Sequence, residues 1–237
     1  MTQYLGEFIG TFILVLLGNG VVAGISLNQT KSQNGGWLLV NLGWAAGVAL
    51  GVYASGFYSP AHLNPAVTIA FAMIGQFDWS QVPGFIIAQF LGAMVAQIFV
   101  VLHYYPHYQA TQDAPTILGT FSTAPGIRHT ASNFFGEALG TAVLVMSIMA
   151  MGPNQLTSGL GALVVGLIIA GIGFSLGPTT GYAINPARDL GPRLVHSFFP
   201  VPNKGDNDWD YAWIPVVAPI VGAVIGAFIF NAVLAMI

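Results

Sequence analysis

Two copies of the tripeptide Asn-Pro-Ala stand in strongly apolar surroundings and can place polar groups where their neighbours offer none. The six residues are Asn64, Pro65, Ala66, Asn185, Pro186 and Ala187. Asn is among the best helix N-caps, and proline suits the first helical position because its missing N–H would have no partner there. Each triplet therefore predicts a helix start preceded by extended backbone. Each Asn side chain can also offer amide donors to the oxygen of a small molecule.

The residues before each triplet can supply hydrogen-bond acceptors. Extended backbone at membrane depth is tolerated only where protein covers it or where it lines a watery cavity. The carbonyls expected to line such a cavity are those of Pro60, Ala61, His62, Gly181, Tyr182 and Ala183. We interpret His62, the only ionisable residue of its loop, as a neutral side chain that fixes the loop geometry, with gating by pH as the alternative.

One arginine breaks the similarity between the two motifs. Arg188 follows the second triplet at the position that Val67 occupies after the first. A cation in the first turn of a helix opposes the helix dipole, and a charge inside a membrane marks a functional site. We therefore predict that Arg188 projects donors into a conduit and repels cations. An ion pair with Asp189 is the structural alternative, although neighbouring residues on a helix do not face each other.

Glu7 and Glu137 are the only charged residues inside the predicted membrane spans. A carboxylate at the bilayer centre costs about 3 kcal/mol, so each needs partners. A proton or cation site is one interpretation. We favour structural support, in which each carboxylate accepts hydrogen bonds from an irregular loop that would otherwise have unsatisfied backbone groups.

The composition indicates that membrane helices must position these residues. The chain is 55% hydrophobic and only 5% charged, with a mean hydropathy of +0.73, whereas about a quarter of the residues in a soluble domain are charged. A spanning helix needs about 20 apolar residues. Six stretches meet or approach this length, namely residues 4–25, 37–57, 83–102, 134–151, 159–176 and 212–237. The sequence predicts a multi-pass all-α membrane protein.

The chain also contains an internal repeat. The segment GEFIGTFILVL that starts at Gly6 matches GEALGTAVLVM at Gly136, and each half later reaches its Asn-Pro-Ala triplet. Each half has three spanning stretches, so the second half begins on the opposite side of the membrane and the repeats are inverted. We expect one channel domain over residues 1–237, with repeats at about 1–125 and 126–237. The short segments after the triplets, residues 65–74 and 186–199, are predicted half-helices.

The half-helices are expected to meet N-terminus to N-terminus at mid-membrane. Their dipoles would place about half a positive charge each at that point. Such a centre repels cations and protons while neutral molecules pass. Stripes of small residues predict close helix packing around it; these are Gly43, Gly47 and Gly51, then Ala88, Gly92 and Ala96, then Ala218, Gly222 and Gly226.

The segments SPAHLNPAVT and GYAINPARDLGPR resemble the paired signature loops of the major intrinsic proteins, the aquaporins and aquaglyceroporins. The likeness covers essentially the whole chain. It implies an aquaporin-like fold of six transmembrane helices and two half-helices, forming a passive single-file channel in the cell membrane. It also implies a homotetramer with both termini in the cytoplasm. That topology would place Lys31, Arg128 and Lys204 outside, against the positive-inside tendency.

The resemblance further implies a selectivity filter of four residues, Trp44, Gly173, Tyr182 and Arg188. Water-selective members usually have histidine at the position of Gly173, and glycine there opens the pore. The resemblance then implies that Trp44 and Tyr182 contact the carbon edge of a polyol while Arg188 binds its hydroxyls. Asp189, expected to act as structural support, and Arg193 also resemble the glycerol-conducting branch.

Two positions depart from the family pattern. Pro60 stands where the family usually has glycine, and Tyr182 stands where glycerol facilitators commonly have phenylalanine. The expected solutes are glycerol and water. Urea, dihydroxyacetone and protonated lactic acid are the other small uncharged candidates.

Three other functions compete with this interpretation. A strict water channel is the nearest alternative, and an ion-coupled transporter would need Glu7 or Glu137 beside the solute path. An enzyme is not expected, because no nucleophile–base pair, metal-ligand cluster or phosphate-binding loop stands out. No cofactor, metal or nucleic-acid partner is expected either, since cysteine is absent and the net charge is −3 without a basic run.

Overall fold

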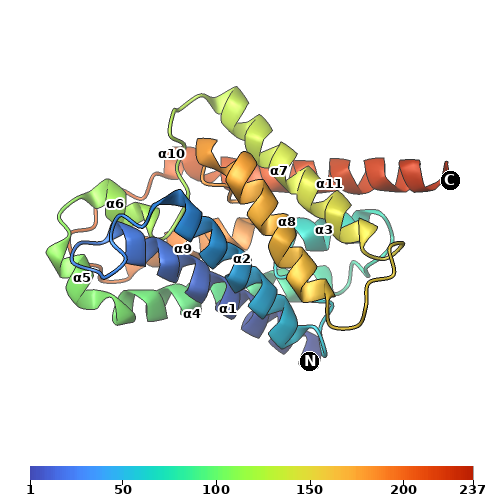
Figure 1. Ribbon diagram of the computed structural model, residues 1–237, viewed down its shortest axis with the longest axis horizontal. Coiled ribbons are helices and arrows are strands. Elements are labelled where there is room, and N and C mark those ends of the chain that lie inside the picture. The colour runs from blue at the N-terminus through green and yellow to red at the C-terminus, as the bar shows by residue number, and fades with distance from the viewer. Residues whose placement is uncertain (237) are drawn as a thin grey trace.

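The computed structural model describes residues 1–236 and contains helices but no β-strand in that range (Figure 1). The first half of the chain supplies α1 (Thr2–Ser26), α2 (Gly36–Ser55), α3 (Pro65–Met73) and α4 (Val82–His103). The second half supplies α7 (Thr130–Ala150), α8 (Gly161–Ser175), α9 (Pro186–Phe198) and α11 (Ile214–Leu234). The shorter elements are α5 (Tyr105–Ala110), α6 (Ala114–Gly119), the 3-10 turn η1 (Gly177–Thr179) and α10 (Trp209–Ala212). The predicted all-α architecture is confirmed.

Five helical stretches of the described chain are long and apolar enough to cross a membrane: α1, α2, α4, α7 and the stretch Trp209–Leu234, which joins α10 to α11. The sixth apolar helix, α8, has only 15 residues. It is therefore about 22 Å long at about 1.5 Å per residue. The predicted span at 159–176 is longer than the helix itself, because α8 begins at Gly161 and its C-cap residue Leu176 leads into η1.

The two half-helices, α3 and α9, contact each other and lie among the longer helices (Figure 1). Each one packs against the last long helix of the opposite half, α3 against α11 and α9 against α4. The other main packing pairs are also equivalent between the halves, since α1 packs on α4 as α7 packs on α11. This exchange of partners is what an inverted repeat predicts.

Two glycines show how closely the equivalent helix pairs approach. A Cβ atom on Gly92 of α4 would lie 2.4 Å from the carbonyl oxygen of Phe8 in α1. A Cβ atom on Gly222 of α11 would lie 1.9 Å from the carbonyl oxygen of Ala138 in α7. Both distances are too short for any side chain, so the backbones themselves are in contact at these points. The close packing predicted at these two glycines is confirmed.

Candidate functional site

The loop before α3 is held by a carboxylate of α1. Glu7 is fully buried and accepts hydrogen bonds from the Ser59 hydroxyl, from the backbone N–H of His62 at 3.0 Å and from that of Leu63 at 2.7 Å. Gln89 of α4 donates a further bond of 2.8 Å to the same carboxylate. The two backbone N–H groups have no other hydrogen-bond acceptor in the described chain.

The loop before α9 is held in the same way by α7. Glu137 is 1% exposed and accepts hydrogen bonds from the Thr180 hydroxyl at 2.6 Å, from the N–H of Ala183 at 3.0 Å and from that of Ile184 at 2.8 Å. Ser59 and Thr180 occupy equivalent loop positions, as do the two pairs of backbone donors. Both carboxylates thus hold the backbone of a loop, which is the arrangement expected of structural support.

Each loop contains non-glycine residues in the left-handed backbone region. The φ angles are 53° at Ala61, 52° at Leu63, 37° at Tyr182 and 43° at Ile184. Such residues are costly and persist only where the surroundings over-determine them, which occurs most often at binding sites. The carboxylates take up N–H groups of the loops. No hydrogen bond found in the described chain reaches the carbonyls of residues 60–62 or 181–183, which leaves these acceptors free.

The two motif asparagines bond to each other's loops. The Asn64 amide donates to the carbonyl of Ile184 at 2.7 Å, and the Asn185 amide donates to that of Leu63 at 2.8 Å. The side-chain oxygens accept from the backbone N–H two residues ahead and so cap α3 and α9. Because an amide carries two N–H groups, each Asn has one donor beyond the one used across the interface.

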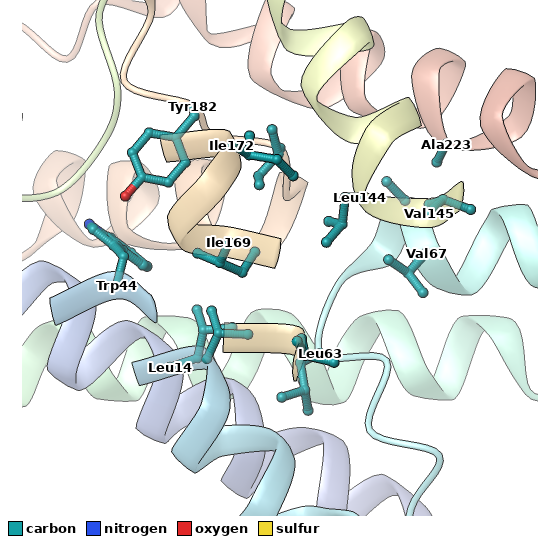
Figure 2. Packing of buried hydrophobic residues seen from close by; sticks show 14 of the residues in the cluster. Leu14, Trp44, Leu63, Val67, Leu144, Val145, Ile169, Ile172, Tyr182 and Ala223 are labelled. Atoms are coloured by element: carbon teal, nitrogen blue, oxygen red, sulfur yellow. The ribbon is translucent and has the colours of Figure 1, made fainter. Parts of the chain in front are cut away.

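A cavity of about 530 Å³ runs past both asparagines. Its walls are mostly apolar side chains of α1, α2, α7 and α8, including Leu14, Val48, Val52, Leu144, Ile148, Val165 and Ile169. Its polar lining comes from the loops and from Arg188. Pro60, Ala61, His62, Tyr182 and Ala183 line it, whereas Gly181 does not. Figure 2 shows the hydroxyl of Tyr182 pointing toward Trp44, and both side chains line the cavity.

Arg188 places its guanidinium against the Trp44 ring, with the Cζ atom 4.1 Å from the ring centroid. The residue is 7% exposed. It forms no ion pair with any described residue, and its Nη1 atom is buried without a hydrogen-bond partner. A buried guanidinium with a free donor is costly, so this group is suited to receiving a polar solute.

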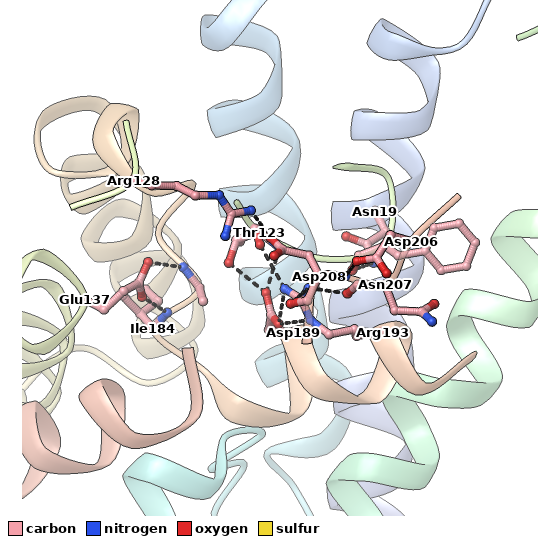
Figure 3. A network of polar contacts seen from close by, with 12 residues as sticks. Asn19, Thr123, Arg128, Glu137, Ile184, Asp189, Arg193, Asp206, Asn207 and Asp208 are labelled. Atoms are coloured by element: carbon pink, nitrogen blue, oxygen red, sulfur yellow. Dashed lines mark hydrogen bonds and ion pairs between the residues drawn. The ribbon is translucent and has the colours of Figure 1, made fainter. Parts of the chain in front are cut away.

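The neighbouring carboxylate is occupied elsewhere, so the alternative pairing of Arg188 with Asp189 does not form. Asp189 accepts bonds of 3.0 and 3.1 Å from Arg193, one helical turn ahead, and bonds from the N–H and hydroxyl of Thr123. Arg193 also donates to the carbonyls of Thr123, Asn207 and Asp208. Figure 3 shows this buried network on α9. It fixes the half-helix that carries Arg188 and leaves the Arg188 charge unneutralised.

His62 lines the cavity from an aromatic cage. Its Nδ1 atom lies 3.1 Å from the Thr68 hydroxyl, and the centroids of the rings of Phe71, Phe77 and Phe85 lie 5.4, 4.8 and 5.5 Å from its own. This apolar cage favours the neutral imidazole. The geometry thus supports the interpretation of His62 as a side chain that fixes the loop.

The space beside Gly173 is filled by a residue that the sequence analysis did not identify. Gly173 is not among the residues that line the cavity. A Cβ atom there would lie 1.8 Å from Oδ1 of Asn41 and 2.8 Å from Cζ of Tyr182. The sequence did contain a signal for this residue: Asn41 is an amide in an apolar span, three residues before Trp44. That spacing puts both side chains on one face of the helix.

Comparisons with known proteins agree with this geometry. The family model described as "Major intrinsic protein" matches residues 1–230. Glycerol uptake facilitator protein 3 of Lactiplantibacillus plantarum is 55% identical over 97% of this chain and 95% of its own length. The glycerol uptake facilitator protein of Bacillus subtilis is 52% identical over 98% of this chain and 85% of its own. The X-ray structure of the aquaglyceroporin from Plasmodium falciparum superimposes with a TM-score of 0.85 at 32% identity, covering 98% of this chain and 96% of that one.

Proposed function

The chain belongs to the major intrinsic protein family, and we propose that it is a passive channel that conducts glycerol and water and excludes ions. The observation that carries the proposal is the unpaired Arg188 guanidinium over the Trp44 ring, in a cavity that is lined mostly by apolar side chains. Relatives that are about half identical to this chain carry the name glycerol uptake facilitator.

Around Arg188 the cavity has an aromatic wall and a hydrogen-bond donor, and a polyol has an apolar edge and hydroxyl groups that match them. Its carbon edge can lie against the rings of Trp44 and Tyr182, while its hydroxyls accept hydrogen bonds from Arg188. Further along, the free amide donors of Asn64 and Asn185 and the free loop carbonyls can replace the solute's hydration. Each step exchanges one hydrogen-bond partner for another, so a neutral solute meets no deep trap.

Ions are disfavoured for two electrostatic reasons. The N-termini of α3 and α9 meet beside the asparagines, and each contributes about half a positive charge. Arg188 adds a fixed positive charge to the lining of the cavity. No Asp or Glu is among the residues that line the described cavity, and Glu7 and Glu137 are occupied by their loops. This arrangement gives no support to an ion-coupled transporter.

A strict water channel is the second candidate, and one observation favours it. Asn41 and Tyr182 fill the space that Gly173 would otherwise leave open, which narrows the filter on that side. Tyr182 also carries a hydroxyl, which adds bulk and polarity to the same wall.

The assembly and location follow the family pattern in this proposal. The protein forms a homotetramer in the cell membrane, with one pore in each protomer and both termini in the cytoplasm. Exposed apolar residues on α2, α4 and α11, such as Leu50, Phe99 and Ile225, provide surfaces for lipid or for neighbouring protomers. Urea, dihydroxyacetone and protonated lactic acid are further small uncharged solutes in this proposal.

Light scattering of proteoliposomes that carry the purified protein tests the proposal directly. Water and glycerol permeation are recorded on one sample, with and without proton and sodium gradients, against protein-free vesicles. Fast glycerol re-swelling that is independent of both ion gradients is the expected result. Fast water flux without glycerol flux would assign a strict water channel, and dependence on an ion gradient would assign a coupled transporter.

A further inference from the structure

We propose that Asn41 is a specificity-determining residue of the filter, because its amide fills the space that Gly173 leaves and offers an acceptor to a hydroxyl of the permeating solute. This inference rests on the proposed function, since it concerns the same selectivity filter around Arg188. Neither Asn41 nor Gly173 is among the residues that line the cavity, so the amide sets the width of the filter from the space beside Gly173, next to Tyr182.

Hydrogen bonds to Trp37 fix where the Asn41 amide lies. Asn41 donates from Nδ2 to the carbonyl oxygen of Trp37, one turn earlier, at 2.8 Å. The Trp37 indole in turn donates to the carbonyl oxygen of Gly173 at 3.0 Å, which ties α8 to α2 at this level. The Trp37 ring also meets Tyr182 edge to face, with centroids 5.8 Å apart. The Asn41 amide is therefore held beside Gly173 and Tyr182.

The residues at positions 41 and 173 compete for one volume. A Cβ atom on Gly173 would lie 1.8 Å from Oδ1 of Asn41, well inside van der Waals contact. Any side chain at position 173 must therefore displace the amide. Conversely, a smaller residue at position 41 would open the space beside Gly173, which the Asn41 amide now fills.

Three buried polar atoms in this region lack partners in the described structure: Oδ1 of Asn41, the hydroxyl of Tyr182 and Nη1 of Arg188. They come from three separate elements. Leaving a buried donor or acceptor unsatisfied is unfavourable, and a hydroxyl can satisfy both kinds. Tyr182 and Arg188 line the cavity, whereas Asn41 lies one layer back, beside Gly173. A small polyol can bond to Arg188 while its carbons face Trp44, and in this proposal an adjacent hydroxyl reaches the Asn41 oxygen.

A double-mutant cycle between positions 41 and 173 tests the shared volume. We expect Gly173→Ala alone to lower glycerol and water permeability by about tenfold, and the double variant Asn41→Ala, Gly173→Ala to recover most of that loss, because contacting residues are coupled. Gly171→Ala on the same helix is the matched control, since a Cβ atom there meets nothing within 4 Å. Additive losses in the cycle would overturn the proposal.

The acceptor is tested by Asn41→Leu, which keeps the side-chain volume and removes the oxygen. We expect glycerol permeability to fall by about fivefold or more relative to water, because a glycerol hydroxyl that bonds to Asn41 would be left without that partner. Unchanged relative permeabilities of glycerol and water in a variant that unfolds at the wild-type temperature would overturn this role. If the wild-type protein conducts no glycerol, the proposed function fails, yet water permeation still reports whether positions 41 and 173 are coupled.

Discussion

At the scale of single residues, the most informative position is the one where the two halves differ. Val67 and Arg188 follow equivalent triplets, yet only Arg188 carries a charge, and its guanidinium lies 4.1 Å from the Trp44 ring centroid. Asp189 could have neutralised it but is bonded to Arg193 and Thr123 instead. The buried network on α9 therefore keeps a positive charge free in the lining of the cavity.

Replacing Arg188 by valine restores the symmetry of the repeats and should weaken ion exclusion. Two like charges about 4 Å apart repel by about 4 kcal/mol at an effective dielectric constant of about 20. We expect the cation conductance in planar bilayers to rise by about tenfold or more. Arg128→Ala is the control, because its side chain is 58% exposed and is not among the residues that line the cavity. Equal leakage from both variants would contradict the role given to Arg188.

At the scale of elements, the half-helices depend on the long helices that enclose them. α11 packs on both α7 and α3, and α4 packs on both α1 and α9. Glycine allows these helices to approach until backbones touch, so each long helix can hold a half-helix of the other repeat on one side and its own partner on the other.

Gly222→Ala tests this close approach. The new Cβ atom would lie 1.9 Å from the Ala138 carbonyl oxygen, and a backbone atom cannot move aside as a side-chain end can. We expect a loss of about 1–3 kcal/mol of unfolding free energy, the usual cost of overpacking. Gly20→Ala in α1, where nothing lies within 4 Å, should instead be neutral or gain up to about 1 kcal/mol from helix propensity. Thermal unfolding in detergent compares the two variants, and equal midpoints would refute the packing argument.

At the scale of the whole molecule, the pseudo-symmetry of the repeats extends to individual hydrogen bonds. Glu7 and Glu137 bond to equivalent loop atoms, and Asn64 and Asn185 each bond to the opposite loop. The centre of the protein is thus assembled from both halves at once. Neither loop has its hydrogen bonds complete without the other half of the chain.

Glu7→Gln and Glu137→Gln should therefore destabilise the protein by comparable amounts. Glutamine presents an N–H group where one carboxylate oxygen accepted a backbone N–H, and each unsatisfied buried donor costs about 1–3 kcal/mol. We expect the unfolding temperature to fall by about 2–4 °C per kcal/mol, with a somewhat larger loss at Glu7, which also bonds to Gln89. Asp210→Asn, an exposed carboxylate, is the control. A large loss at one glutamate and none at the other would contradict the equivalence of the halves.

The sequence by itself determined the features that arise from local signals. Helix starts at Asn64 and Asn185 follow from N-cap and proline chemistry, the membrane spans follow from apolar length, and the inverted repeat follows from an odd number of spans in each half. The hydrogen bonds from the loops to Glu7 and Glu137 could be predicted, because a buried carboxylate must find donors and the loops must find acceptors. These are properties of single segments and of the bilayer as a solvent.

Only the tertiary structure decided which atoms meet across the fold. It placed the Asn41 amide in the space beside Gly173, 132 positions away along the chain, and joined the Trp37 indole to the Gly173 carbonyl. Such contacts depend on how two helices are rotated and shifted against each other. A shift of about 1.5 Å, the rise of one helical residue, would change every one of these partners. No local pattern in the sequence encodes that rotation, because it is set by the packing of all the helices together.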